Sequence, residues 1–176
     1  MSWDVYIKGF YNYLLIEKSL SKNTVDAYVR DINKMAKYFL DLEKSKNIKS
    51  VSYEDFQNYL AHLNDEKIKA RSQSRVISSI RAFYKFLIIE KEIDNNPSEL
   101  LETPKTGKKL PEFLTVDEVN QLVNEINRSK PEGERNLAIL EVLYGCGLRV
   151  SELIELKLSE IYWKEGFIRI IGKGNK

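Results

Sequence analysis

The stretch SQSRVISSIRAFYKFLII (Ser72–Ile89) decides how the rest of the chain is interpreted. At about 100° per residue its apolar side chains gather on one side of a helix. They are Val76, Ile80, Phe83, Tyr84 and Leu87. Polar residues occupy roughly the opposite third of the circumference, and these are Arg71, Ser74, Arg75, Ser78, Arg81 and Lys85. The pattern predicts an amphipathic helix with a buried face and a basic outer face.

The basic face of this helix is suited to DNA. No acidic residue interrupts the basic residues between positions 67 and 85, although a helix that is only soluble usually carries acidic partners four residues away. Arginine reaches phosphates and guanine edges, and serine hydroxyls donate to phosphates. The alternative is a solvated surface face. We predict DNA contacts from Arg71, Ser72, Arg75, Ser78, Arg81 and Lys85, and expect charge reversal at Arg75 or Arg81 to weaken binding without unfolding the domain.

Three other helices are predicted before this one. Apolar residues recur at helical spacing over 3–14 and again over 25–40. Ser52 and Asp55 resemble a capping box that opens a third helix. Together the four helices predict an N-terminal helical bundle over residues 1–93.

Helical periodicity is lost between residues 94 and 113, which contain three prolines and a glycine. Proline removes a backbone donor and stiffens the chain, so this interval is predicted to be an inter-domain linker. Lys105, one of its lysines, is a further candidate for DNA contact.

A second domain is predicted over residues 114–176. Thr115 and Glu118 form a capping box ahead of one helix. A later helix is expected to end at Gly145 and Gly147, because glycine tolerates the left-handed conformation of a C-cap.

A short helix over 150–157 and a strand over 167–171 follow in the sequence. Arg149 precedes that helix and carries a fork of donors suited to phosphate oxygens, whereas Lys173 follows the strand and carries a compact, titratable ammonium. The chain is therefore predicted to be mainly α, with a small β-hairpin near its end.

Composition describes an ordinary soluble protein, with 43% hydrophobic and 31% charged residues among 176 and a net charge of +2. A single cysteine, Cys146, and a single histidine, His62, offer neither a disulfide nor a zinc site. The sequence has no apolar run of membrane-spanning length and no signal peptide. We predict a cytoplasmic protein without metal or cofactor.

Several blocks, in their order and spacing, resemble the tyrosine site-specific recombinases, particularly those of the Xer type. The blocks are LSKNTVDAYVRDI, SRVISSIRAFYKFL, NPSELLETPK, LPEFLTVDEV, LYGCGLRVSELIEL and IRIIGKGNK, which span essentially the whole chain. The resemblance implies a SAM-like core-binding bundle for residues 1–93 and the first part of an α+β catalytic domain for residues 114–176. From the first block we take Asn23, Thr24 and Arg30 as additional DNA-contact candidates.

The resemblance also implies a mechanism in which a tyrosine attacks the scissile phosphate and forms a 3′-phosphotyrosine link. No cofactor is implied, so fixed cations must stabilise the charge on the phosphate. Arg149 matches the first catalytic arginine of the family, and Lys173 matches the hairpin lysine that protonates the leaving 5′-oxygen. Glu152 matches a glutamate that supports this site or orients Arg149.

The rest of the family's catalytic set is missing from this sequence. The His-x-x-Arg motif, a further His or Trp and the nucleophilic tyrosine all lie beyond the hairpin lysine in the family, whereas the last tyrosine here is Tyr162. We therefore expect a fragment that binds DNA and does not cleave it.

Several functional alternatives remain open. The resemblance favours Xer-like resolution of chromosome or plasmid multimers, and the alternatives are a mobile-element integrase, a non-catalytic DNA-binding protein and a helix-bundle interaction module. The expected partners are duplex DNA with inverted half-sites and, for the full-length protein, a homo- or hetero-tetramer; the fragment alone is expected to be monomeric.

Overall fold

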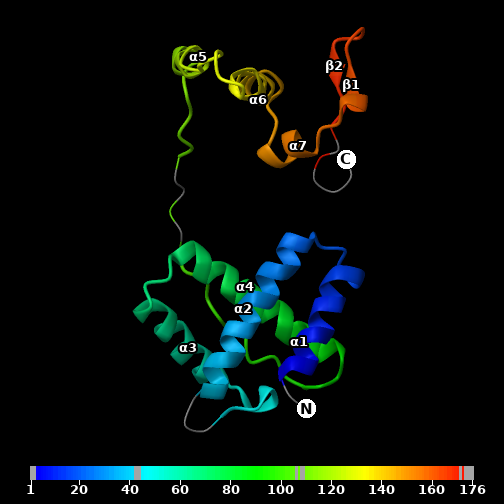
Figure 1. Ribbon diagram of the computed structural model, residues 1–176. Coiled ribbons are helices and arrows are strands. Elements are labelled where there is room, and N and C mark those ends of the chain that lie inside the picture. Colours follow the sequence, from blue (N-terminus) through cyan, green and yellow to red (C-terminus); the bar gives the residue numbers. More distant parts are fainter. Residues whose placement is uncertain (1–2, 42–44, 106, 108–109, 171, 173–176) are drawn as a thin grey trace. The chain divides into compact units, whose positions relative to one another are not determined.

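The computed structural model divides the chain into two compact units, residues 1–108 and 109–176 (Figure 1). It describes residues 3–41, 45–105, 107, 110–170 and 172. Lys173 therefore lies outside the described residues.

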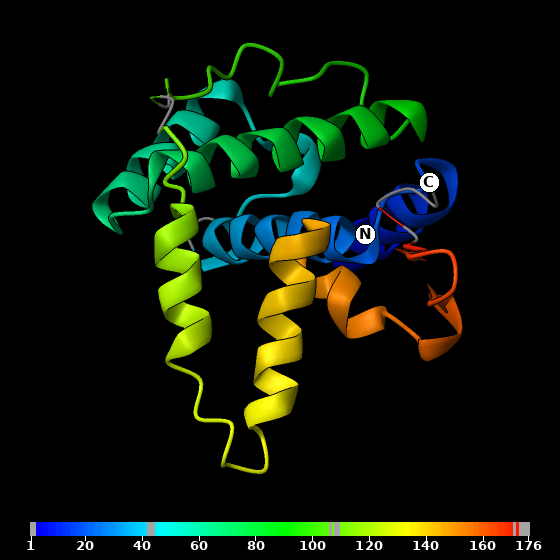
Figure 2. The same cartoon turned by 90° about the horizontal axis from the view of Figure 1, so that it is seen from above.

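Unit 1 is a bundle of helices. Its elements are α1 (Trp3–Asn12), the π-helical turn η1 (Tyr13–Glu17), α2 (Lys22–Asp41), the 3₁₀ turn η2 (Ile48–Ser50), α3 (Tyr53–Asp65) and α4 (Ala70–Ile89). The two longest helices, α2 and α4, pack along one another (Figure 2). The predicted four-helix bundle is confirmed.

Aromatic side chains fill the core of unit 1. The ring of Trp3 stacks on those of Phe39 and Phe83, with centroids 6.0 and 6.4 Å apart. Phe56 meets Tyr84 edge-on at 5.1 Å. These contacts join α1, α2, α3 and α4 around one centre, and burial of such large apolar surfaces is the main favourable term in folding.

Helix α4 is buried over a wider arc than its sequence predicts. The five apolar residues of the predicted stripe are all buried. Ile77 and Phe86 are buried as well, and so are the polar side chains of Gln73 and Ser79. The outer face that α4 presents to solvent is correspondingly narrower.

The ends of α3 show two local motifs. The predicted capping box is confirmed, because the Asp55 side chain accepts from the Ser52 N–H and Ser52 Oγ accepts from the Asp55 N–H. At the other end Lys67 has a left-handed φ of 57°, and Ile68 N–H donates to Leu63 O at 3.0 Å. Lysine thus occupies a position that glycine usually takes in this C-capping motif.

The first part of the predicted linker interval packs on unit 1. Ser98 and Leu101 are both buried, and the Arg81 guanidinium donates to the Leu101 carbonyl. Asn96 Oδ1 accepts from the backbone and the hydroxyl of Ser98. Residues up to 101 are therefore held by the bundle.

The described residues of unit 2 form three α-helices and a two-stranded antiparallel sheet. Its elements are α5 (Val116–Asn124), α6 (Gly133–Cys146), α7 (Val150–Glu155), the 3₁₀ turn η3 (Leu158–Glu160), β1 (Ile161–Tyr162) and β2 (Phe167–Ile168). In the sheet Ile161 pairs with Ile168 and Tyr162 with Phe167. The predicted small hairpin is confirmed, although the second strand ends at Ile168 rather than at residue 171.

The helix ends of unit 2 follow the sequence signals in part. The capping box of Thr115 and Glu118 opens α5 as predicted. Gly147 follows α6 with φ 62° and ψ 31°, the left-handed cap that only a residue without Cβ adopts easily. Gly145 lies inside α6, so the prediction that it helps to end the helix was wrong.

Unit 2 buries little apolar surface. Gly133 is the only buried residue among those described between 110 and 172. A Cβ on Gly133 would lie 2.4 Å from Asn127 O, so glycine is needed for this close approach of α6 to the preceding turn. In contrast, Ile154, Leu158 and Trp163 are 77%, 81% and 79% exposed.

This difference in burial predicts different stability for the two units. A polypeptide of residues 1–108 should fold alone and unfold cooperatively, because it contains the whole aromatic core. A polypeptide of residues 109–176 should show weak helical signal and no cooperative transition, since it has no comparable core to offset chain entropy. Circular dichroism during thermal unfolding measures both, and a cooperative transition of 109–176 alone would contradict this account.

Candidate nucleic-acid interface

The basic residues of α4 differ in their exposure to solvent. Arg71, Arg81 and Lys85 are exposed, as the sequence predicts, whereas Ser78 and Arg75 are partly buried. Among the described residues, no hydrogen bond or ion pair engages the side chains of Arg71 and Lys85. These two are therefore the cations of α4 most available to an external ligand.

Arg75 has a partner inside unit 1. Its Nη1 donates to Asp31 Oδ2 at 2.6 Å and to Ala27 O at 3.2 Å. Ser79 Oγ donates to the same Asp31 oxygen at 2.9 Å. Asp31 is only 3% exposed, so Arg75 neutralises a buried carboxylate and joins α4 to α2.

The environment of Asp31 sets two opposing effects on its pKa. Burial raises the pKa of this carboxyl, while the hydrogen bond from Ser79 and the charge of Arg75 oppose that rise. Sequence analysis missed Asp31 as a structural residue. The available signal was its place beside Ile32 on the apolar stripe of α2, where an unpaired carboxylate would be costly.

Arg81 and the serines also have contacts within unit 1. Arg81 holds the Leu101 carbonyl at the end of the packed segment. Ser74 Oγ donates to Ala70 O at 3.0 Å and Ser78 Oγ donates to Ser74 O at 2.9 Å. A contact between Ser78 and a phosphate, which stays a prediction, would replace that bond within the helix.

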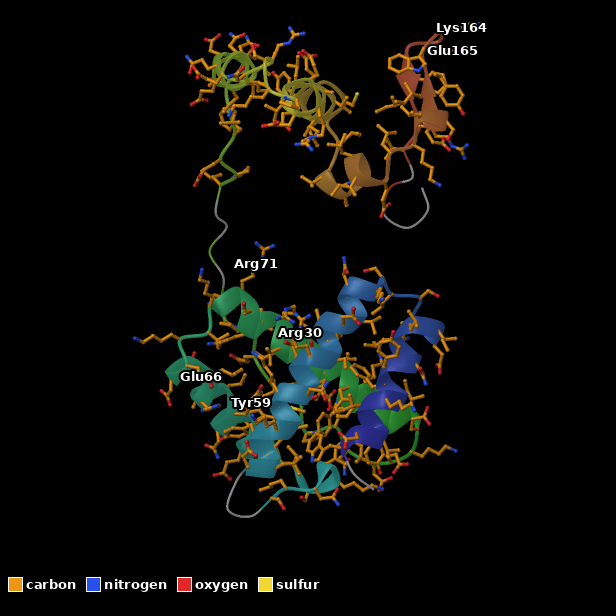
Figure 3. All side chains as sticks on the ribbon, viewed as in Figure 1. Arg30, Tyr59, Glu66, Arg71, Lys164 and Glu165 are labelled. Atoms are coloured by element: carbon orange, nitrogen blue, oxygen red, sulfur yellow. The ribbon has the colours of Figure 1, made fainter. Side chains whose placement is uncertain are left out.

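The candidates on α2 lie in its first half. Asn23 and Arg30 are exposed and Thr24 is partly buried, with its Oγ1 2.9 Å from Ser21 Oγ. Figure 3 labels Arg30 on α2 and Arg71 in the first turn of α4. Lys105, beyond the packed segment, is exposed. Contact of these residues with DNA stays a prediction.

In unit 2 the structure brings Arg149 and Glu152 together at the start of α7. The backbone N–H of Arg149 donates to Glu152 Oε2 at 2.8 Å, and its Nη1 donates to Glu152 Oε1 at 2.6 Å. The backbone hydrogen bond, and next the guanidinium, hold the pKa of Glu152 below its usual range. The Arg149 side chain is 73% exposed while that of Glu152 is 12% exposed, so the anchored glutamate fixes an outward-facing guanidinium.

Two family models match the chain and together cover most of it. The model described as the phage integrase N-terminal SAM-like domain matches residues 7–91. The model of the phage integrase family matches residues 112–176. The chain belongs to the phage integrase family. The first match lies within unit 1, and the second includes Arg149 and Glu152.

Curated relatives within this family are tyrosine recombinases. The chain is 40% identical over 173 residues to the protein named tyrosine recombinase XerD of Staphylococcus saprophyticus, covering 98% of this chain and 58% of the relative. It is 42% identical over 170 residues to XerD of Oceanobacillus iheyensis, covering 97% and 57%. The chain thus spans somewhat more than half the length of these relatives.

Solved structures share the integrase fold. A lambda integrase (75–356) dimer bound to a COC′ core site aligns with a TM-score of 0.74 at 21% identity, covering 99% of this chain and 59% of that one. The Tn1549 transposon integrase in complex with circular intermediate DNA aligns with a TM-score of 0.63 at 19% identity, covering 90% and 51%. At these identities the likeness shows the fold alone.

The described residues contain neither a metal-ligand cluster nor a membrane-spanning helix. No group of three or more His, Cys, Asp or Glu residues there is arranged to hold a metal ion. The same part of the chain contains no helix with the length and apolarity needed to cross a membrane. His62 lies on α3, where its ring stacks on Tyr38 at 4.9 Å.

The link between Arg75 and Asp31 yields a stability prediction. Arg75→Met should lower the free energy of unfolding by about 2 kcal/mol, because it leaves the buried carboxylate of Asp31 unpaired. This loss is smaller than is usual for a broken buried ion pair, because the Arg75 side chain is partly exposed to water. Arg71→Met is the matched control and should change it by less than about 0.5 kcal/mol. Urea unfolding measures both variants.

The same geometry changes the expectation for charge reversal. Arg75→Glu would place a second carboxylate against Asp31, so we now expect it to destabilise unit 1 as well as weaken binding. A wild-type unfolding midpoint for Arg75→Met would show that the ion pair contributes nothing to stability.

Proposed function

We propose that unit 1 binds duplex DNA and that the whole protein is a site-specific recombinase. It would cleave and rejoin DNA strands through a 3′-phosphotyrosine intermediate, as in Xer-like resolution of chromosome or plasmid multimers. The proposal for unit 1 rests on one observation, the outer face of α4, which contains no acidic residue. On this face Arg71 and Lys85 are exposed and have no intramolecular partner among the described residues.

The spacing of these two residues supports a groove or backbone contact. Lys85 follows Arg71 by fourteen positions on the helix, which corresponds to a rise of about 21 Å and places the two side chains within about 40° of each other around the axis. Such a helix can enter the major groove and reach phosphates at both ends. Arg30 on α2 adds a third exposed cation.

For the whole protein we assign roles to three residues of unit 2. Arg149 would bind the non-bridging oxygens of the scissile phosphate bidentately, and Lys173 would protonate the leaving 5′-oxygen. Glu152 would hold the guanidinium of Arg149 in place, in keeping with the two hydrogen bonds between them. No metal or cofactor is assigned to the reaction.

The partners are proposed from the same relationships. Solved neighbours include an integrase dimer on a core site and an integrase with circular intermediate DNA, which supports duplex DNA as the partner here. We propose inverted half-sites, a homo- or hetero-tetramer for the whole protein, and a cytoplasmic location. The identity to XerD proteins favours Xer-type resolution over mobile-element integration.

DNA binding by the chain of 176 residues tests the role of α4. The double variant Arg71→Ala/Lys85→Ala should weaken binding at every salt concentration and lower the slope of log K against log salt by about two, since each phosphate contact contributes about 0.9. Lys8→Ala, which removes an exposed cation on α1, is the matched control and should change neither the affinity nor the slope. Fluorescence anisotropy over a salt series measures both quantities.

Two outcomes would redirect this assignment. If the slope of log K against log salt is the same for the double variant and the wild type, α4 is not part of the interface. Absence of salt-dependent binding by the wild type would favour a helix-bundle interaction module instead.

Cleavage tests the assignments in unit 2. In a polypeptide that carries the complete family domain, Arg149→Ala should slow covalent capture of a nicked substrate by about 10²–10³-fold while leaving DNA affinity nearly unchanged. Glu152→Gln should cost about tenfold, because the amide still accepts from the Arg149 N–H but lacks the charge. The chain of 176 residues should form no adduct. Wild-type capture by Arg149→Ala would contradict the proposed role.

A further inference from the structure

A strongly basic cavity lies at the junction of α3 and α4 in unit 1. Its volume is about 290 Å³. Its lining contains four cationic side chains, those of Lys34, Lys67, Lys69 and Arg75, and a single carboxylate, that of Asp31. The carboxylate of Asp31 counts against an anion, but one of its oxygens already accepts from both Arg75 and Ser79. The cavity therefore retains a net positive charge.

Tyr59 belongs to this lining, and its hydroxyl is a buried donor that is not used by the described residues of unit 1. Tyr59 is 2% exposed, and its hydroxyl is buried without a hydrogen-bond partner among the described residues. A buried hydroxyl without an acceptor is costly, so a group that supplies one would be favoured there. Figure 3 labels Tyr59 and Glu66 on α3.

A neighbouring cavity shares Tyr59 but has a different charge. Its volume is about 470 Å³, and its lining includes two carboxylates, Asp41 and Glu66, beside Lys34 and Lys37. Positive and negative side chains balance there. An anionic acceptor for Tyr59 is therefore favoured on the side of the basic cavity.

The turn that carries Lys67 has a fixed conformation. The Lys67 N–H donates to Asn64 O at 2.8 Å, and the Gln73 amide donates to Asn64 Oδ1 at 2.6 Å and to Ile68 O at 2.9 Å. Lys67 adopts φ 57°, which glycine would adopt with less strain. A residue with a Cβ at a strained backbone position is a reason to look for a function.

We propose that this cavity is a phosphate site. A phosphate group would accept from the Tyr59 and Ser72 hydroxyls and from the ammonium groups of Lys67 and Lys69, while Arg75 stays on Asp31. Because the cavity lies at the start of α4, the source we favour is a DNA backbone phosphate next to the segment that α4 contacts. In that form the inference rests on the proposed DNA binding and assigns one defined backbone contact.

The chain contains a matched control for Lys67. Lys91 follows α4 with the same φ of 57°, and Glu92 N–H donates to Leu87 O at 2.9 Å in the same capping motif. Lys91 does not line the basic cavity. Lys67→Gly and Lys91→Gly should raise the melting temperature by a similar amount, about 2–5 °C.

Of these two variants, only Lys67→Gly should affect DNA binding. Lys67→Gly should weaken DNA binding about five- to tenfold and reduce the salt slope by about one, whereas Lys91→Gly should bind like wild type. Tyr59→Phe should leave the melting temperature equal or higher, since its hydroxyl has no partner to lose, and should weaken binding about fivefold. Fluorescence anisotropy and thermal unfolding measure these effects on the 176-residue chain.

Titration with inorganic phosphate distinguishes the two sources of the phosphate group. In NMR spectra of the DNA-free chain, phosphate at millimolar concentration would shift Ser72 and Lys67 amides if the site accepts free phosphate. If the two cavity variants lose DNA affinity and the phosphate titration gives no such shifts, the ligand is a DNA backbone phosphate. If the shifts occur and the variants keep wild-type DNA affinity, the ligand is free phosphate.

Two results separate failure of this inference from failure of the proposed function. Wild-type DNA affinity in Lys67→Gly and Tyr59→Phe, together with no phosphate shifts, overturns the phosphate site while leaving DNA binding by α4 intact. If the wild-type chain does not bind DNA, the proposed function fails, and the phosphate titration alone decides the site.

Discussion

The ion pair between Asp31 and Arg75 is the constraint on which the proposed DNA-binding surface depends. It crosses from α2 to α4, the two helices that carry most of the candidate contacts, and Ser79 completes it. Replacement of a buried ion pair by apolar side chains often leaves stability unchanged. The ion pair would therefore matter here mainly because it specifies one packing arrangement of the helices. Our hypothesis is that it fixes the register of the two helices, and with it the relative positions of Arg30 and Arg71.

Arginines of α4 thus divide into two kinds. Arg75 pairs with Asp31 and joins α4 to α2, whereas Arg81 donates to the Leu101 carbonyl and holds the segment that follows α4. Both guanidinium groups are therefore partly occupied by contacts within unit 1. Arg71 has no such partner among the described residues and is the better candidate for an external phosphate. In unit 2 a similar pairing with Glu152 orients Arg149 but leaves its side chain largely exposed.

Sequence predicted the features that local physics determines. The helices, the capping boxes at Ser52 and Thr115 and the left-handed cap at Gly147 follow from spacing and side-chain chemistry within a few residues. The partner of Arg75 could not be predicted this way, because it lies 44 residues earlier and only packing of α2 on α4 brings it near. Burial of Ile77 likewise depends on how many neighbours surround α4, which a helical projection does not contain.

The most direct test of the central claim is chemical-shift mapping of the 176-residue chain on titration with duplex DNA. The account predicts that perturbed amides lie along the outer face of α4 from Arg71 to Lys85, near the start of α2, and at the α3–α4 turn. Perturbations confined to α1 and η1, or to unit 2, would contradict it, because the surface fixed by Asp31 and Arg75 would then not be the one that meets DNA.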